Sequence, residues 1–484
     1  MKTSRLLIST LAIALLASCN VNFIISHPDD PEKKDTVDNR TPDQKRDLGY
    51  LFDLQALPEI TLTLSEDEWN RYLNNYDNNQ YNRQYVAAQF EFRKGEQVYH
   101  RDSVGVRPRG NTSRRRPESY ARQPHDSNNP EWHHAHFGVR FTEYTTGERF
   151  FGADRIVLKW FNNDPAYCRE VFCYDLFRRF GVWSAPRSSY CRLYIYIIGD
   201  KRPAYFGVYQ MIEGVRKGYL DDRKKDGFLP DDDGNIWKCA YNSDGKADLS
   251  DFNSTGKSKM GVATDDRDYS YALKTNKTTG LSAAQQELYD FMEQMRPLQS
   301  GSDELKLYLE QHLYVDQFLR ALAVNVAVGM WDDYWINANN YYCYFDSQHK
   351  FLFIPYDYDN TLGTNGIISN AGTHDPIHWG SRDGDRLLVR KVLSISEYED
   401  TYKLYLKQLV TDTDLMQPDA AISRVGQLQQ LVENYVENDT GEDMTVSDKS
   451  ASWGDIGYRL LSGDNSGEAN SNFFRSKAKT INDL

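Results

Sequence analysis

The sequence predicts an α+β protein whose N-terminal part is rich in strands and whose C-terminal part is mainly helical. Apolar and polar residues alternate through much of the first half, a pattern typical of half-buried strands. From about residue 282 onward the pattern changes to helical spacing. The 484 residues are 40% hydrophobic and 13% aromatic, which is enough for a substantial core in one large or two medium domains. Global disorder is therefore excluded.

The expected elements of the first half are short strands and one helix. Residues 164–180 carry apolar or aromatic side chains at helical spacing, and Gly181 stands where it would end that helix. Strands are predicted at residues 57–64, 85–93, 137–141, 191–198 and 205–212, the last two as a hairpin around Gly199-Asp200.

The second half contains a predicted buried helix followed by a β-hairpin. Residues 313–330 are largely apolar, carry few charges and contain no proline. Residues 341–345 and 351–355 are rich in aromatic residues and flank a polar turn, which is typical of a hairpin. A register centred near Gln348 places Asn339 opposite Asp357 and Asn340 opposite Tyr356.

Acidic and amide residues stand on both sides of this hairpin. Asp332, Asp333, Asn339 and Asn340 precede it, and Asp357 and Asp359 follow it. Carboxylate and amide oxygens are the ligands that Mg²⁺ prefers. Where only one or two protein carboxylates bind the ion, phosphate groups of a substrate usually complete its coordination. Asp and Asn also favour turns and helix caps, so a structural role for the same residues stays open.

The order of these parts matches the catalytic lobe of a protein kinase. There, a helix is followed by an Asp-containing loop that ends in Asn, then by a hairpin and a second Asp. One Asp orients the attacking hydroxyl, while the Asn and the second Asp hold the metal ions. The usual kinase strings are absent: no His-Arg-Asp precedes Asp332, and Asp357-Tyr358-Asp359 stands where Asp-Phe-Gly would.

Seven strings in sequence order resemble the CotH kinase family of atypical, secreted or surface kinases, in a bacterial lipoprotein form. They are Arg109-Gly110-Asn111-Thr112-Ser113, Leu158-Lys159 with Arg169-Glu170, Gly207-Val208-Tyr209 with Glu213, Asn235-Ile236-Trp237-Lys238, the Asp332 loop, Ile354-Pro355-Tyr356-Asp357-Tyr358-Asp359, and Leu387-Leu388-Val389-Arg390 leading into Tyr398 and Tyr402. The resemblance covers roughly residues 55 to 415. It implies a two-lobed, atypical protein-kinase-like fold, the cofactors ATP and Mg²⁺ or Mn²⁺, and phosphorylation of protein hydroxyls.

The resemblance also implies roles for the acidic residues. Asp332 would orient the acceptor hydroxyl, with Asp333 as the alternative. Asn339 or Asn340, together with Asp357 and Asp359, would hold the metal ion.

Two lysine–glutamate pairs are candidates for the phosphate-binding pair that kinases form between a strand Lys and a helix Glu. Lys159 ends an apparent strand and Glu170 lies in the next predicted helix. Lys238 and Glu213 offer a second version of the pair. The sequence does not choose between them, and either lysine could be an ordinary surface cation.

Seven arginines fall between Arg101 and Arg122, with Arg109 next to Gly110. Guanidinium groups bind phosphate oxygens through two donors at once, and a glycine lets backbone amides approach closely. The cluster could cover the phosphates of ATP, or it could be a basic loop that neutralises an acidic protein. The family resemblance favours a phosphate contact for Arg109.

The N-terminus has the pattern of a bacterial export signal. Lys2 and Arg5 precede a short apolar run that ends in Leu16-Ala17-Ser18-Cys19. This ending resembles a lipobox, so residues 1–19 are predicted as a lipoprotein signal with acylation at Cys19. Asn20 resembles the residue of a lipoprotein sent to the outer membrane or surface of a Gram-negative bacterium. Residues 20–50 are predicted as a flexible tether to that membrane.

The remaining boundaries follow from composition. Residues 51–415 are predicted as the CotH-like kinase domain, with a polar loop or insertion at about 221–268, and residues 416–484 as a helical and polar tail that is loosely packed near its end. Five cysteines other than Cys19 lie in the chain, several of them in apolar or aromatic runs, which is typical of small buried hydrophobes.

Charge and family resemblance together predict the function. A net charge of −13 and a pI near 5.3 argue against nucleic acid as a partner. We expect a surface or secreted protein kinase that acts on a protein substrate. The alternative is a non-catalytic surface lipoprotein that binds a host, matrix or glycan partner, and a third, weaker option is a glycosidase with Asp332 and Asp357 as paired carboxylates.

Overall fold

The computed structural model describes residues 47–128, 130–162, 164–277, 280–364, 366–380, 386–436 and 472–484. The predicted signal segment, the predicted acylation site Cys19 and nearly all of the predicted tether lie outside these residues. The fold begins slightly before the predicted boundary at residue 51, with helix α2 (Leu48–Leu51). Its side chains Leu48 and Leu51 are buried in the core of the strand-rich part, which explains the earlier start.

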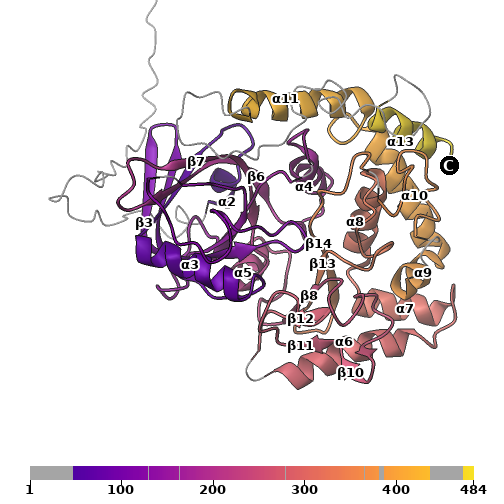
Figure 1. The fold of residues 1–484 in the computed structure, drawn as a ribbon. Coiled ribbons are helices and arrows are strands. Elements are labelled where there is room, and N and C mark those ends of the chain that lie inside the picture. Colours follow the sequence, from indigo (N-terminus) through magenta and orange to yellow (C-terminus); the bar gives the residue numbers. More distant parts are fainter. Residues whose placement is uncertain are drawn as a thin grey trace, which may run out of the picture.

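The strand-rich part is a closed seven-stranded barrel (Figure 1). Around the barrel the strands are β1 (Glu59–Leu64), β2 (Val86–Lys94), β3 (Gln97–Arg109), β4 (His136–Arg140), β5 (Arg155–Lys159), β7 (Ala204–Glu213) and β6 (Ser188–Ile197). Neighbouring strands are antiparallel except β1 and β6, whose parallel pairing closes the barrel. Alternate residues of β1, such as Ile60 and Leu62, point into an aromatic core. Helix α3 (Glu66–Asn78), capped by Ser65, packs Trp69 against the same core.

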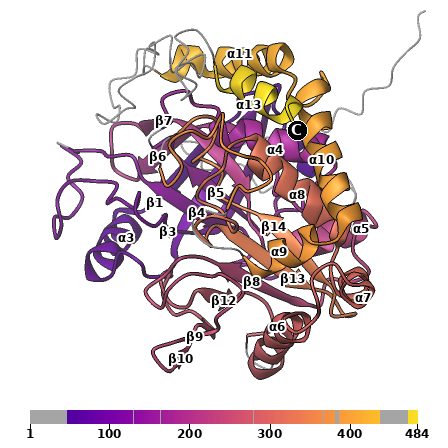
Figure 2. The ribbon, with the colours of Figure 1, turned by 90° about the vertical axis from the view of Figure 1, so that its right-hand side faces the viewer.

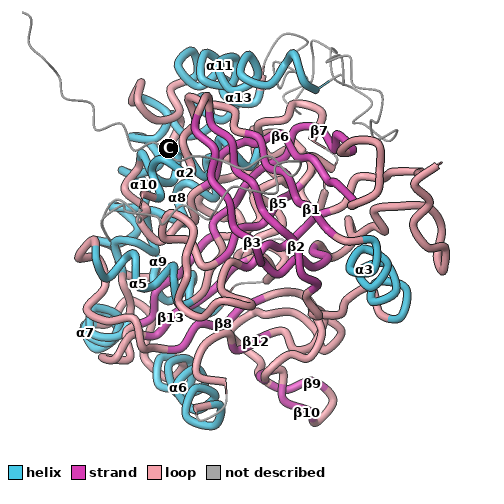
Figure 3. Tube along the Cα trace, turned by 90° about the vertical axis from the view of Figure 1, so that its left-hand side faces the viewer, coloured by secondary structure: helices cyan, strands magenta, loops and turns pink. Residues whose placement is uncertain are grey.

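A second sheet lies beside the barrel and carries the predicted hairpin. Its order is β11 (Met260–Gly261), β12 (Tyr271–Leu273), β8 (Asn235–Cys239), β13 (Tyr341–Phe345) and β14 (Phe351–Pro355). The hairpin pairs Tyr341 with Pro355 and Phe345 with Phe351, so its bounds and its centre at Gln348 are as predicted. A separate two-stranded ribbon, β9 (Asn253–Ser254) and β10 (Lys257–Ser258), lies at the edge of the molecule (Figure 3).

Helices form the remaining part of the molecule, beside this sheet (Figure 2). They are α6 (Leu281–Met295), α7 (Asp303–His312), α8 (Val315–Ala327), α9 (Leu387–Leu393), α10 (Ser396–Thr411), α11 (Pro418–Val436) and α13 (Phe473–Asn482). Helix α8 packs against β14 and α6 against β11, whereas α11 lies along strand β7 of the barrel. Helix α4 (Arg169–Arg179) lies between the barrel and this helical part, and Gly181 after it has a positive φ of 77°, as a helix-ending glycine does. No helix within the described ranges is both long and apolar enough to cross a bilayer.

The structure corrects the predicted polar insertion at residues 221–268. Helix α5 (Lys217–Lys225) enters this segment, and strand β8 is the middle strand of the second sheet. The buried side chains Ile236, Trp237 and Cys239 hold β8 in the core. The strand is short and its neighbours in the sequence are rich in Asp and Gly. The polar composition of the segment therefore predicted a loop, although the strand itself contains apolar residues.

The tail is also packed more firmly at its end than its composition suggests. Phe473, Phe474 and Ile481 of α13 are fully buried in the core of the helical part. Two adjacent phenylalanines therefore anchor the end of the chain. The five cysteines outside the signal segment are free and buried in this structure, as predicted.

Candidate catalytic centre at the end of strand β5

Three segments bring the predicted acidic and basic residues together. In β5, Ile156 and Leu158 point into the barrel core, so Lys159 faces out of the barrel toward the helical part. Helix α4 presents Glu170 in its first turn. Asp164 fixes the start of this helix, because its carboxylate accepts the backbone N–H of Arg169 at 3.0 Å and pairs with the Arg169 guanidinium.

Lys159 is the centre of an ion cluster. Its Nζ donates to Oε2 of Glu170 at 2.7 Å, lies 3.1 Å from Oδ2 of Asp359, and contacts Oδ1 of Asp357. The other oxygen of Glu170 accepts the backbone N–H of Tyr358 at 3.0 Å. A strand lysine, a helix glutamate and the acidic residues after the hairpin therefore meet in one place, as the first of the two predicted pairs requires.

The cluster holds one ammonium and three carboxylates, and this imbalance explains its protonation behaviour. Burial would lower the pKa of Lys159, but Asp357, Asp359 and Glu170 hold it well above its usual range. Burial raises the pKa of Glu170, and it raises the pKa of Asp359 to about 7 against the opposing effect of Lys159. For Asp357, burial raises the pKa, but Lys159, together with Lys238 and His136, lowers it below its usual range. An additional cation would relieve the excess negative charge.

Asp332 lies on the loop after α8 and is surrounded by side-chain amides. Its Oδ1 accepts the amide N–H groups of Asn337 at 2.7 Å and Asn339 at 3.0 Å. Its Oδ2 accepts from Asn340 at 3.0 Å and Asn360 at 3.4 Å. Burial and the nearby charge of Asp357 raise the pKa of Asp332, while the amide donors lower it. The carboxylate is thus held in one orientation by neutral donors and not by a cation.

Asp333 has a different environment from its neighbour. Its side chain is buried and accepts the backbone N–H of Ile336 at 2.9 Å and the amide of Asn325 in α8. Its carbonyl accepts the backbone N–H groups of Asn337 and Asn339. Burial raises the pKa of Asp333 to about 6. Asp333 therefore fixes the shape of the loop, whereas Asp332 is the carboxylate that the loop presents.

The two candidate amide ligands also differ. Oδ1 of Asn339 accepts the backbone N–H of Tyr241 at 2.7 Å, so this oxygen is already used. The amide N–H of Asn340 donates to the carbonyl of Asp332 at 3.0 Å, and no described residue donates a hydrogen bond to its Oδ1. Asn340 and Asp357 both have positive φ, 55° and 66°, a strained conformation that clusters at functional sites. Asn340 is the better-placed metal ligand of the two.

A metal ion at this centre would be held by Asp357, Asp359 and Oδ1 of Asn340. The carboxylates of Asp357 and Asp359 are 35% and 31% exposed, so a ligand can reach them. Among the described residues, no group of three or more His, Cys, Asp or Glu side chains is arranged to hold a metal by itself. The oxygen-only donor set fits Mg²⁺ or Mn²⁺, which keep several water or phosphate ligands of their own.

The remaining predicted residues lie at the edge of this centre or outside it. Arg109, at the end of β3, donates to the hydroxyl of Tyr356 at 3.4 Å. Lys238 is in the second sheet, where burial and nearby Arg109 lower its pKa to about 8. Glu213 does not contact Lys238. It binds the Arg223 guanidinium instead, with its Oε2 2.9 Å from Nη2. The lysine–glutamate pair that forms is therefore Lys159–Glu170.

Sequence reasoning missed several residues that shape the centre. Asp266 accepts hydrogen bonds from Arg107 at 2.7 Å and from Arg114 at 2.6 Å, and so fixes the arginine-rich segment beside Arg109. Asn325 links Asp333 to the hydroxyl of Tyr358. The density of arginines was the sequence signal for Arg107 and Arg114. Their partner Asp266 could not be found in this way, because it is about 150 residues away in the sequence. Nothing local marks Asn325, because it lies inside an apolar helix.

Comparison with known proteins identifies the family of the chain. Residues 106–460 match the family model described as CotH kinase protein, which is more than half of the chain. The chain therefore belongs to the CotH family. It is also similar to a protein of Rhizopus delemar named Invasin CotH7, with 23% identity over 259 residues. That alignment covers 53% of this chain and 39% of the relative.

Proposed function

We propose that this protein is an atypical protein kinase that transfers the γ-phosphoryl group of ATP to a protein hydroxyl. The observation that carries the proposal is the contact of Lys159 with both Glu170 and Asp357. In kinases, a lysine–glutamate pair fixes the α and β phosphates, and an Asp after a hairpin holds the metal ion. The barrel with α4 and the helical part would then be the two lobes of a kinase-like fold.

Each residue has a role in this proposal that follows from its contacts. Asp332, held by four amide groups, would accept a hydrogen bond from the attacking hydroxyl and orient it. Lys159 would contact the nucleotide phosphates, and Arg109 would add a guanidinium above them. Asp357, Asp359 and Asn340 would hold Mg²⁺ or Mn²⁺, which supplies positive charge to the phosphate oxygens. Phosphoryl transfer depends mainly on such positioning and charge stabilisation.

The predicted export signal adds a location to the proposal. Acylation at Cys19 would tether the domain to the outer membrane or the cell surface, where its substrate would be another surface or secreted protein. The support for this is the sequence of residues 1–19 alone.

The test is transfer of labelled phosphate from ATP by the full chain with Mg²⁺ or Mn²⁺. Asp357→Asn and Asp332→Asn should each reduce transfer at least about 100-fold, because each removes a charge that acts on the reacting groups. Asp375→Asn is the matched control, since Asp375 is an exposed carboxylate that pairs with His378. Wild-type transfer that both site variants retain would contradict the proposal.

The alternative is a surface protein that uses the fold to bind a partner without catalysis. The similarity to a protein named as an invasin favours this alternative. A binding protein has no need to retain ATP. Thermal unfolding with and without ATP and Mg²⁺ separates the two candidates: a rise in Tm that Lys159→Met abolishes supports the kinase, and an unchanged Tm supports the binding protein.

A further inference from the structure

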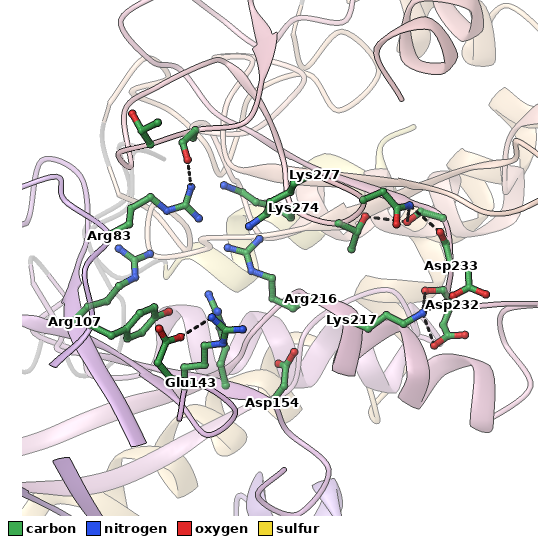
Figure 4. A pocket seen from close by; sticks show the side chains of 18 residues that line it. Arg83, Arg107, Glu143, Asp154, Arg216, Lys217, Asp232, Asp233, Lys274 and Lys277 are labelled. Carbon is green, nitrogen blue, oxygen red and sulfur yellow. Dashed lines mark hydrogen bonds and ion pairs between the residues drawn. The ribbon is translucent and has the colours of Figure 1, made fainter. Parts of the chain in front are cut away.

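A cavity with strongly cationic walls lies at the other end of strand β5 (Figure 4). Its volume is about 630 Å³, which is large enough for a small ligand. Barrel residues such as Arg155 line one side, and residues next to the second sheet, such as Lys274, line the other. Figure 4 shows Arg83, Arg216, Lys274 and Lys277 pointing toward one another across it.

Of the four carboxylates that line the cavity, three are paired with cations, and the fourth, Asp154, accepts the backbone N–H of Gly218 at 3.3 Å. Glu143 pairs with Arg140, and Asp232 and Asp233 both pair with Lys217. Asp266 binds Arg107 at 2.7 Å and lies 3.6 Å from Arg83. Eight lysine and arginine residues line the cavity against four carboxylates, so positive charge remains in excess.

Four cations face the cavity without a carboxylate partner among the described residues: Arg155, Arg216, Lys274 and Lys277. Nε of Arg155 and Nη1 of Arg216 are buried and have no hydrogen-bond partner within the described part of the chain. Lys274 is only 8% exposed, although a lysine is almost never buried this far without a partner. The buried groups of Arg155, Arg216 and Lys274 cost folding free energy, and an anion would satisfy them.

The protonation behaviour of the lining residues agrees with a site for an anion. Burial, followed by neighbouring Arg155, lowers the pKa of Arg216 to about 9. Burial and Arg216 lower the pKa of Lys277 to about 8 and that of Lys274 well below its usual range. Burial would raise the pKa of Tyr85 in the same wall, but Arg155, Arg107 and Arg216 bring it down to about 8.

We propose that this cavity binds a multiply charged, phosphate-type anion at a site separate from the catalytic centre. Guanidinium groups bind phosphate oxygens through two donors, and one phosphate-type ligand can satisfy several cations that a single carboxylate cannot. Arg155 and Lys159 stand four residues apart on β5, which places the two ends roughly 13 Å apart at the usual rise of a strand. The anion is therefore not the phosphate group that Lys159 would contact.

The probe is inorganic pyrophosphate without a divalent metal, measured by calorimetry on the full chain. Lys274→Met and Arg216→Gln should each weaken pyrophosphate binding about tenfold or more, because each removes a cation with no other partner. Arg296→Gln is the matched control: it removes the same charge from an exposed arginine that pairs with Glu293. Binding of ATP with Mg²⁺ should stay within about twofold in all three variants.

Lys159→Met separates this site from the nucleotide site. It should weaken binding of ATP with Mg²⁺ and leave pyrophosphate binding intact. Pyrophosphate binding that is lost in Lys159→Met and competes with ATP would overturn the proposal, because the cavity would then be an extension of the nucleotide site. The proposal would also be overturned if the wild type failed to bind pyrophosphate at millimolar concentration. The same holds if Lys274→Met and Arg216→Gln bound pyrophosphate as tightly as the wild type does. If Lys274→Met does not fold, Arg216→Gln decides.

Discussion

The two ends of strand β5 carry charge clusters of opposite imbalance. At one end, Lys159 stands among Glu170, Asp357 and Asp359, so three carboxylates share one ammonium. At the other end, Arg155, Arg216 and Lys274 line one cavity, and none of them forms an ion pair with a described carboxylate. Neither arrangement is what stability alone would favour, because uncompensated buried charge opposes folding. The comparison supports the two proposals made above, a metal ion at the first end and an anion at the second.

The largest effect that sharpens this comparison is on stability. Lys159→Met leaves three carboxylates without their cation and should lower the free energy of unfolding by about 3–5 kcal/mol. Millimolar Mg²⁺ should restore part of this loss, because it replaces the missing positive charge. Lys274→Met removes an uncompensated cation and should leave stability unchanged or higher. Urea unfolding of both variants, with and without Mg²⁺, measures these differences.

Equal destabilisation by Lys159→Met and Lys274→Met would contradict the conclusion that the two ends of β5 differ in charge balance. It would mean that Lys274 contributes to packing as much as Lys159 contributes to charge balance. A loss in Lys159→Met that Mg²⁺ leaves untouched would contradict a metal ion at the negative end.

The second prediction concerns which lysine acts on the nucleotide. Lys159→Met should reduce phosphoryl transfer at least about 100-fold, since it removes the only lysine that contacts Glu170 and Asp357 among the described residues. Lys238→Met is the matched comparison, because Lys238 is also half-buried on a strand near Asp357 but has no carboxylate contact in the described structure. It should reduce transfer less than about tenfold. Initial rates at saturating ATP provide the measurement, and the opposite ranking would assign the phosphate contact to Lys238.

The hairpin and its flanking acids were predictable because the signals are local. Aromatic strands around a polar turn fix the register, and the register sets which residues face each other across the hairpin. The choice between Lys159 and Lys238 was not predictable, since it depends on how α4 docks against β5. The same holds for Asp332 and Asp333, whose roles differ only through the side chains that surround them.

The cationic cavity could not be predicted from the sequence at all. Arg155, Arg216 and Lys274 each stand alone in the chain, separated by roughly 60 residues, and no pattern joins them. Strand β3 was missed for a related reason, because its first half is charged on both faces and shows no clean alternation. In both cases the barrel closure and the second sheet supply the neighbours that the sequence does not show.

A third cluster, His125 between Glu118 and Asp200, is similar in composition to the Lys159 cluster. Variants of it can show whether such a cluster has a purely structural role. One ring nitrogen of His125 lies 3.0 Å from Glu118 and the other 2.9 Å from Asp200, and Trp69 of α3 donates to Glu118 at 2.7 Å. The cluster therefore ties the loop after β3 to α3 and to the β6–β7 turn. Burial would lower the pKa of His125, but its hydrogen bonds to Glu118 and Asp200 raise it to about 9.

The smallest predicted effect follows from the sign of this shift. The folded pKa lies above the ordinary value of 6.5, so the stabilisation is fully present below about pH 6.5 and is lost as the pH rises through about 9. It amounts to on the order of 3 kcal/mol at most. Urea unfolding at pH 6 and pH 9.5 should show His125→Gln clearly less stable than the wild type at pH 6, with the difference much reduced at pH 9.5. The control His378→Gln, at an exposed histidine that pairs with Asp375, should change little at either pH. A difference for His125→Gln that is the same at both pH values would mean that this cluster holds the loop by shape and hydrogen bonding without the charge of the imidazole. The excess of carboxylates around Lys159 would then be weaker support for a metal ion at that end.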